Sequence, residues 1–166
     1  MSDPIDISNV DFHEIARRGD TEVMATFLRA GLEPDLLNPQ GYSLLMIAAY
    51  NQQQGMVNLL LEHGVDANRA DPAGNTPLMG TCFKGYVNVA EQLLEGGADP
   101  NVRNGAGATA LMFAAMFNQL EIAKLLLAGG AALDVVDARG LTAVELAESH
   151  GHIELAKHLG VATSPV

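Results

Sequence analysis

The chain has 166 residues, 48% of them hydrophobic, and a net charge of -11 from 20 Asp and Glu against 9 Lys and Arg. This length fits one domain, and the negative charge opposes binding to nucleic acid and to anionic membranes. The single cysteine, Cys82, excludes an internal disulfide bond, and no apolar run predicts a signal peptide or a membrane span. We therefore expect a cytoplasmic protein that binds neither nucleic acid nor membrane.

Glycines recur every 33 residues along most of the chain, in two series: Gly31, Gly64, Gly97 and Gly130, and Gly41, Gly74, Gly107 and Gly140. Repetition at this period is typical of stacked helical units whose hydrophobic core runs as a line through the stack. Such stacks usually present a long surface to a partner instead of enclosing an active site. Functional residues are therefore expected on a surface.

Each unit predicts a turn followed by two antiparallel helices, as residues 71–103 illustrate. Asp71–Asn75 combines an Asx residue, a proline and a glycine, which favours a tight turn. Thr76 is a favourable N-cap ahead of a proline, so a first helix is expected from there to about Lys84. A second helix with an apolar stripe follows Gly85 and ends at Gly96-Gly97, since glycine easily adopts the left-handed C-cap conformation.

The same signals for a turn, an N-cap and two helices recur and predict five units in chain order. We assign an N-terminal extension to residues 1–8, repeats to about 9–37, 38–70, 71–103, 104–136 and 137–160, and a loose C-terminal tail to 161–166. The N-cap recurs at Ser43, Thr109 and Thr142, and the core position at Leu45, Leu111 and Val144. Each helix pair is too short to be stable alone, so neighbouring pairs must stack. In the second unit Gln52–Gly55 replaces the expected glycine, so the register is least constrained there.

These residues resemble a known repeat family. Gly74-Asn75-Thr76-Pro77-Leu78, Gly85, Val89, Leu93-Leu94, Gly97-Ala98-Asp99 and Asn101 are similar to the ankyrin repeat. The resemblance covers roughly residues 9 to 160 and implies an all-α ankyrin-repeat solenoid of five helix-turn-helix units with short β-turn connections. It departs where the family often has histidine: His13 matches, but Met46, Met79, Met112 and Glu145 occupy the later repeats.

The resemblance also implies that the turn tips and the exposed side of each first helix line a concave binding face. Comparison of the units predicts an apolar band of partner-binding residues at Tyr42, Tyr50, Phe83, Met116, Phe117 and Leu141. Exposed aromatic clusters favour interfaces, and four of the eight aromatic residues are in this band. The alternative interpretation is that Phe83 and Phe117 pack between adjacent repeats.

Basic residues map to the same face or to the turn tips: Arg17, Lys84 and Arg139 as candidate contacts, with Arg18 and Arg103. None of the variable positions compared there is acidic. We therefore expect a partner surface that combines apolar groups with carboxylates.

Other motifs do not predict chemistry. Gly105–Ala110 fits a dinucleotide-binding pattern, but no strand precedes it. His13–Arg17 lacks the second histidine of a zinc motif, and His150, His152 and His158 do not supply four convergent donors. Cys82 occupies a small-residue position shared with alanines. We expect no catalytic residue, no cofactor and no metal.

The sequence therefore predicts a monomeric, non-catalytic module that binds a protein partner through its concave face. Small free-standing ankyrin proteins further suggest that it regulates or stabilises one partner enzyme. The alternatives are a small-molecule-binding protein or enzyme with a cleft between repeats, and a purely structural spacer.

Overall fold

Paired helices follow one another along the chain. The computed structural model describes residues 7–163, and its side-chain environments are described to residue 160. The helices within that range are α1 (Phe12–Arg18), α2 (Thr21–Arg29), α3 (Leu44–Tyr50), α4 (Gln54–Glu62), α5 (Pro77–Lys84), α6 (Val87–Glu95), α7 (Ala110–Met116), α8 (Leu120–Ala128), α9 (Ala143–Ser149) and α10 (Ile153–Thr163). Residues 1–6 of the predicted extension and 164–166 of the predicted tail lie outside the described range. The last helix takes in residues 161–163, which the sequence analysis assigned to the tail.

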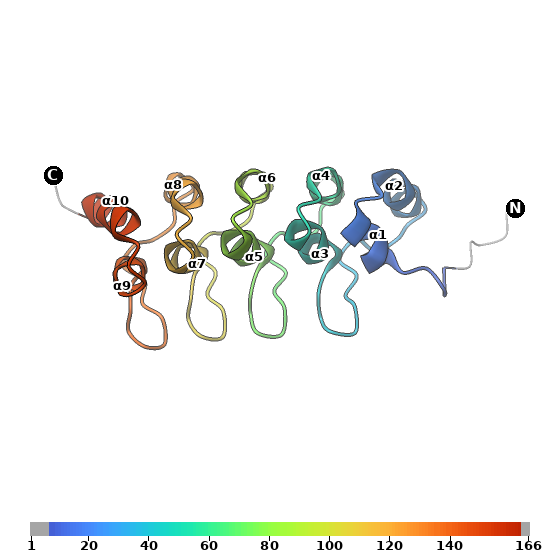
Figure 1. Cartoon of the computed structure of the whole chain (residues 1–166). Coiled ribbons are helices and arrows are strands. Elements are labelled where there is room, and N and C mark those ends of the chain that lie inside the picture. Colours follow the sequence, from blue (N-terminus) through green and yellow to red (C-terminus); the bar gives the residue numbers. More distant parts are fainter. Residues whose placement is uncertain (1–6, 164–166) are drawn as a thin grey trace, which may run out of the picture.

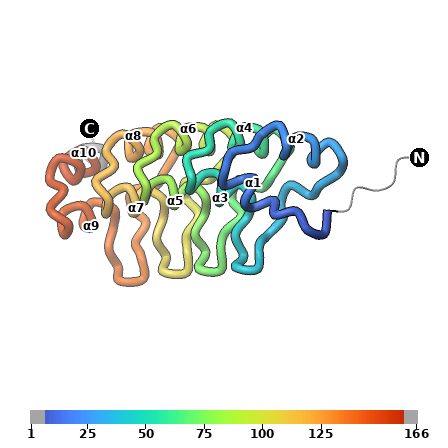
Figure 2. Tube along the Cα trace, turned by 45° about the vertical axis from the view of Figure 1, so that its right-hand side comes forward, coloured from blue at the N-terminus to red at the C-terminus, as the bar shows by residue number. Residues whose placement is uncertain are grey.

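The five helix pairs form a row with two layers (Figure 1). The first helices α1, α3, α5, α7 and α9 make one layer, the second helices make the other, and hairpin turns project from the first layer. Seen from the side, the turns lie parallel to one another, with α1 and α10 at opposite ends of the row (Figure 2). Within residues 7–163 there is no strand, only an isolated antiparallel bridge between Leu37 and Ser43. The predicted all-α solenoid of five helix-turn-helix units is confirmed.

Each hairpin turn is closed by one Asx side chain. The Oδ1 atom accepts hydrogen bonds of 2.8 to 3.1 Å from the backbone amides two and four residues later. The residues that play this part are Asn38, Asp71, Asn104 and Asp137. The glycine three residues later, such as Gly74 with φ +83°, adopts the left-handed conformation that the turn requires. Adjacent turns are also joined by the amides of Gly105 and Ala138, which donate to carbonyls of the preceding turn at 2.9 Å.

The predicted caps begin the first helices. The side-chain oxygens of Ser43, Thr76 and Thr142 accept the amide three residues later, at 3.1, 3.3 and 3.3 Å. Thr109 is the N-cap of α7, but its side chain makes no capping hydrogen bond. Three of the four predicted hydroxyl caps therefore satisfy an otherwise unpaired helical amide.

A continuous line of leucines forms the core. Leu45, Leu78 and Leu111 of the first helices are at most 1% exposed, and so are Leu60, Leu93, Leu126 and Leu159 of the second helices. Met46, Met79 and Met112 are buried between them. Val144, predicted as their counterpart in the last unit, is only half-buried. It packs against the core from the last described helix pair, so the predicted core position is only partly buried there.

The loop between the paired helices keeps its register in every repeat. Gly19, Gln52, Gly85, Asn118 and Gly151, spaced by 33 residues, all have positive φ. Gln52 takes φ +57° without being glycine, and α4 starts at Gln54, 33 residues before the start of α6. The Gln53 side chain then donates to the carbonyl of Arg17 at 2.8 Å and links the first two repeats. The register at Gln52–Gly55 is therefore not shifted.

Replacing Gln52 by glycine is expected to stabilise the protein. The left-handed conformation costs a residue with a Cβ about 1 to 2 kcal/mol, while glycine adds about 0.5 to 1 kcal/mol of backbone entropy cost. Gln52→Gly should therefore raise the free energy of unfolding by about 0.5 to 1 kcal/mol, measured by urea denaturation. Asn118→Gly is the matched control and should gain less, because asparagine adopts positive φ more readily. A loss of stability in Gln52→Gly, or a larger gain in Asn118→Gly, would contradict this explanation.

The turn at Asp137 should make stability depend on pH. The Arg139 guanidinium and then the Leu141 amide stabilise the carboxylate and lower the pKa of Asp137 below its ordinary value of 3.8. A carboxyl group whose pKa is lower in the folded state stabilises the protein at pH values above its unfolded-state pKa. This stabilisation is lost as the pH falls through the folded-state pKa. Asp137→Asn retains an Oδ1 acceptor, as Asn38 and Asn104 have, but loses the charge.

The urea midpoint of Asp137→Asn should therefore be lower than that of the wild type at pH 7, and the difference should shrink as the pH falls below about 4. Arg139→Ala, which removes the largest cause of the pKa shift, should show part of the same loss. A wild-type advantage that stayed constant between pH 7 and pH 3 would refute the assignment.

Candidate protein-binding surface

An exposed row of three aromatic rings crosses the first-helix layer. Tyr50 of α3 stacks with Phe83 of α5, with ring centroids 6.3 Å apart and planes 17° apart. Phe83 meets Phe117, at the end of α7, edge to face at 4.8 Å. The three residues remain 42%, 42% and 40% exposed. We call Tyr50, Phe83 and Phe117 the aromatic row. Its rings pack between adjacent repeats and are still exposed, so the packing interpretation and the exposed-band interpretation both describe it in part.

Phe113 extends the row and was missed by the sequence analysis. Its ring lies 6.4 Å from that of Phe117, nearly parallel to it, while half of the residue is packed against the core. In the 33-residue frame Phe113 corresponds to Ile47 and Gly80. This large variation in size between units was the available signal.

Two hollows lie beside the aromatic row. One, of about 230 Å³, is lined by Met46, Tyr50, Asn75, Thr76, Met79, Gly80, Phe83 and Phe113. The other, of about 390 Å³, is lined by Arg17, Tyr42, Met46, Ile47, Tyr50 and Asn51. Tyr50 and Met46 line both. The predicted contacts Arg17, Tyr42, Tyr50 and Phe83 therefore line one continuous stretch of surface.

The remaining predicted apolar contacts are less exposed. Met116 is half-buried, and its carbonyl lies 2.9 Å from Nε2 of His152 in the next repeat. Leu141 is also half-buried and packs against the core from the last hairpin turn. The ring contacts of the aromatic row include neither residue. The predicted band is therefore strongest over the second to fourth repeats.

Ion pairs reduce the positive charge available on this face. Arg17 and Arg18 both pair with Glu14, at 3.2 and 3.3 Å, and Arg139 pairs with Asp137 at 2.7 Å. Arg103 donates to the carbonyls of Gly107 and Val136 and so ties two hairpin turns together.

Lys84 is different from these arginines. Its Nζ atom lies 4.8 Å from the centroid of the Tyr50 ring, a cation–π contact. None of the five ion pairs between described residues includes it. Lys84 thus places a cation without a carboxylate partner directly on the aromatic row.

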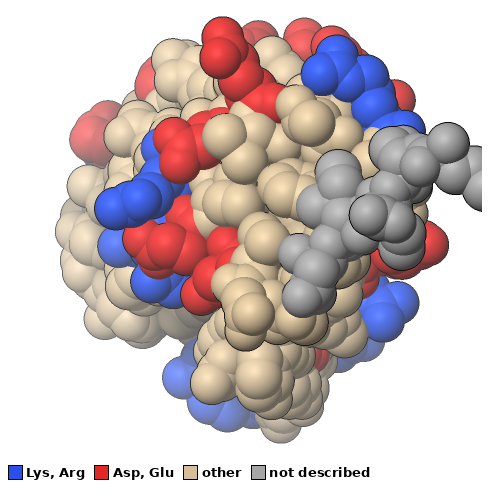
Figure 3. Space-filling model, turned by 90° about the vertical axis from the view of Figure 1, so that its right-hand side faces the viewer, with Lys and Arg blue, Asp and Glu red and all other residues tan. Residues whose placement is uncertain are grey.

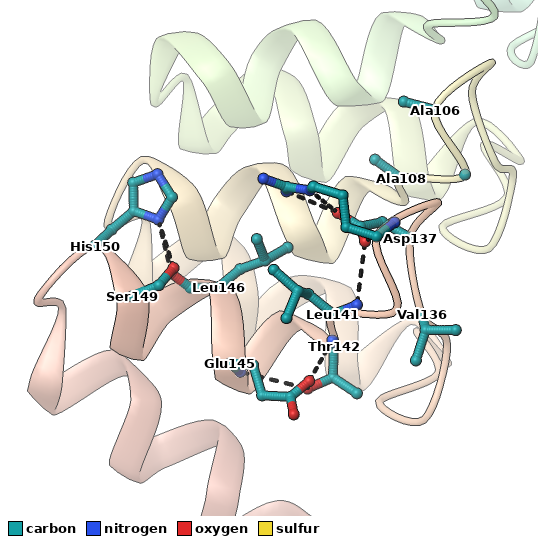
Figure 4. A network of polar contacts seen from close by, with 12 residues as sticks. Ala106, Ala108, Val136, Asp137, Leu141, Thr142, Glu145, Leu146, Ser149 and His150 are labelled. Atoms are coloured by element: carbon teal, nitrogen blue, oxygen red, sulfur yellow. Dashed lines mark hydrogen bonds and ion pairs between the residues drawn. The ribbon is translucent and has the colours of Figure 1, made fainter.

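Charged groups elsewhere are mixed in sign. On the end of the stack that carries α1 and α2, acidic and basic side chains lie side by side with uncharged atoms between them (Figure 3). In the last repeat, the Glu145 carboxylate turns back to Thr142 and completes a capping box (Figure 4). The Thr142 amide and then its hydroxyl lower the pKa of Glu145. The Glu145 carboxylate therefore serves the fold of its own repeat.

His13, His150 and Cys82 hold structural positions. His13 Nε2 lies 3.2 and 3.1 Å from the carbonyl oxygens of Leu36 and Tyr42, which joins α1 to the next hairpin. His150 Nδ1 lies 2.8 Å from the Leu146 carbonyl, near Ser149 (Figure 4). Complete burial raises the pKa of Cys82 to about 12, so its thiol stays protonated at neutral pH.

The described residues contain neither a cluster of metal-ligating side chains nor a helix that could span a membrane. Across residues 7–163, no three His, Cys, Asp or Glu side chains converge in a way that could hold a metal ion. No helix in that range has both the length and the apolar character that crossing a bilayer requires.

Comparison with known proteins identifies the repeat. A family model described as "Ankyrin repeats (3 copies)" matches residues 12–104 and again residues 82–162. No curated protein matches the chain. The two overlapping matches together run from α1 into α10, and hence over most of the 166 residues. The chain belongs to the ankyrin-repeat family.

Proposed function

We propose that this protein is a non-catalytic module in the cytoplasm that binds a protein partner through the face carrying the aromatic row. Ankyrin repeats generally act as protein–protein interaction modules. The observation that carries the proposal for this chain is the row itself, because three large rings remain about 40% exposed on the first-helix layer. Aromatic residues are the commonest anchors of protein interfaces.

The binding face in this proposal comprises the nine residues predicted from the sequence: Arg17, Tyr42, Tyr50, Phe83, Lys84, Met116, Phe117, Leu141 and Arg139. Its centre lies over the second to fourth repeats, where the rings contact one another. Phe113 is added as a contributor to the same face. The partner would offer apolar groups and carboxylates, since Lys84 is the cation among these rings.

The stack favours binding energetically. Helices α3, α5 and α7 each pack on both neighbours in their layer, so the rings are displayed on packed elements and not on free loops. A surface that is already ordered loses little conformational entropy on association. We further propose that the protein acts as a monomer and that its partner is one enzyme, which it regulates or stabilises.

Truncation of the aromatic row should abolish partner binding without unfolding the protein. We expect Tyr50→Ala/Phe83→Ala/Phe117→Ala to lose the partner that the wild type captures from the native cell, because truncating one anchor costs about 2 kcal/mol or roughly 30-fold in Kd. The measurement is affinity purification followed by titration with the purified partner. Circular dichroism confirms that the variant is folded.

The matched control removes exposed apolar groups from the second helices. Val23→Ala/Val87→Ala/Ile153→Ala changes residues that are 45%, 37% and 53% exposed on α2, α6 and α10. This variant should bind as the wild type does. Equal binding by the folded triple alanine variant of the aromatic row would remove this face from the proposal.

A further inference from the structure

We propose that Gly80 opens a specificity pocket that accepts one apolar side chain of the protein partner, next to a carboxylate that Lys84 binds. This inference rests on the proposed function and names the partner chemistry at its centre. The occupant is a segment of another protein in which a branched or aromatic residue lies beside Asp or Glu. A missing side chain, the hollow beside it and the Lys84 ammonium at its rim support this pocket.

Gly80 is the exception in its repeat position. The corresponding residues are Ile47, Phe113 and Leu146, all large and apolar. Gly80 lies inside α5, where glycine weakens a helix relative to residues with a side chain. It is absent from the glycines with positive φ, so the backbone conformation does not require it. The position therefore lacks a side chain for a reason other than the geometry of the helix.

The absence of a side chain at Gly80 leaves room for the Tyr50 ring and for a hollow beside it on the exposed face. The Tyr50 ring leans over the glycine, since a Cβ built at Gly80 would lie 3.1 Å from Tyr50 Cδ2. The rest of the wall comes mainly from Met46, Met79, Phe83 and Phe113, which makes it apolar. An apolar cavity of about 150 Å³ is enough for a benzene molecule. The hollow of about 230 Å³ thus has room for one branched or aromatic side chain.

Two polar side chains in the wall already make hydrogen bonds within the chain. The Thr76 hydroxyl oxygen accepts the Met79 amide at 3.3 Å as the cap of α5. The Asn75 amide group donates to Asp71 and its oxygen accepts from Asn104, at 3.2 and 2.9 Å. Neither group requires a hydrogen bond from an occupant. The pocket therefore favours an apolar side chain over a polar one.

Lys84 supplies the charge complementarity. Its ammonium lies over the Tyr50 ring, the same ring that leans over Gly80, so the cation stands at the edge of the pocket. The chain carries a net charge of -11, and Lys84 belongs to none of the ion pairs between described residues. A carboxylate adjacent to the inserted side chain would be attracted here and repelled by much of the remaining surface.

The test uses a phage-displayed library of random 12-residue peptides, panned on the full chain. Enriched peptides should share an apolar residue next to Asp or Glu. Gly80→Ile introduces the isoleucine that the second repeat has at the corresponding position, Ile47. By filling the pocket, it should weaken the binding of synthetic versions of the enriched peptides at least tenfold. Gly80→Ala should give a smaller loss. Lys84→Gln should weaken binding severalfold and reduce its dependence on salt.

Controls separate loss of the pocket from loss of the fold. Circular dichroism and urea denaturation check that both Gly80 variants are folded, because the Cβ that each adds would lie 3.1 Å from Tyr50 Cδ2 and the ring must shift to admit it. Val87→Ala, on the second helix of the same repeat, should leave peptide affinity unchanged. The inference is overturned if panning enriches no peptide, if the peptides lack the apolar–acidic pair, if folded Gly80→Ile binds them with wild-type affinity, or if ultracentrifugation shows that a second copy of the chain occupies the face.

Binding of the native partner by the two variants distinguishes this inference from the proposed function. Loss of the partner in the triple alanine variant, with full retention in Gly80→Ile, would remove the pocket and leave the binding face in place. Retention in both folded variants would remove both.

Discussion

Every feature of this molecule depends on burial of the apolar faces of short helix pairs against their neighbours. A helix of seven to nine residues is not stable alone in water, and six of the seven residues of α3 are buried in the stack. The 33-residue spacing keeps Leu45, Leu78 and Leu111 in one line, so each repeat completes the core of the next. The same dependence explains the half-buried Val144, which lies in the last described helix pair at one end of the row.

Stacking also determines which residues are free to act. The inward positions of each first helix are committed to the core, and the Asx side chains are committed to the hairpin turns. The outer positions of the first helices take part in neither the core nor the turns, and Tyr50 and Phe83 lie at such positions. Because the repeats are held in register, these rings from separate units come into contact and form one surface. The face proposed for recognition is thus a consequence of the repeat.

Most of the fold could be predicted from the sequence, because turns, caps and leucines recur with the same local chemistry in each unit. The turn at Asp71–Asn75 and the cap at Thr76 have the predicted places. The register at Gln52 could not be predicted, because a residue with a side chain adopts there the positive φ that glycine usually adopts. The positive φ of Gln52 is imposed by the stack, which holds α3 and α4 in place, and the local sequence does not reveal it.

The candidate surface was less predictable, because it depends on side-chain geometry. The aromatic positions followed from comparing units, but the lean of the Tyr50 ring over Gly80 depends on its packing in three dimensions. The pairing of Arg17 and Arg18 with Glu14 did have a sequence signal, since these residues are three and four positions apart on one helix. That spacing predicts ion pairs for both arginines and leaves Lys84 as the cation of the aromatic row.

Hydroxyl-radical footprinting of the complex with the captured partner tests the central claim most directly, since it reports the exposure of individual side chains. If the face carrying the rings is the binding surface, Tyr50, Phe83 and Phe117 become protected from oxidation when the partner is added, while Ile153 on α10 is oxidised as before. Unchanged oxidation of the three rings, with protection confined to the second helices, would contradict it.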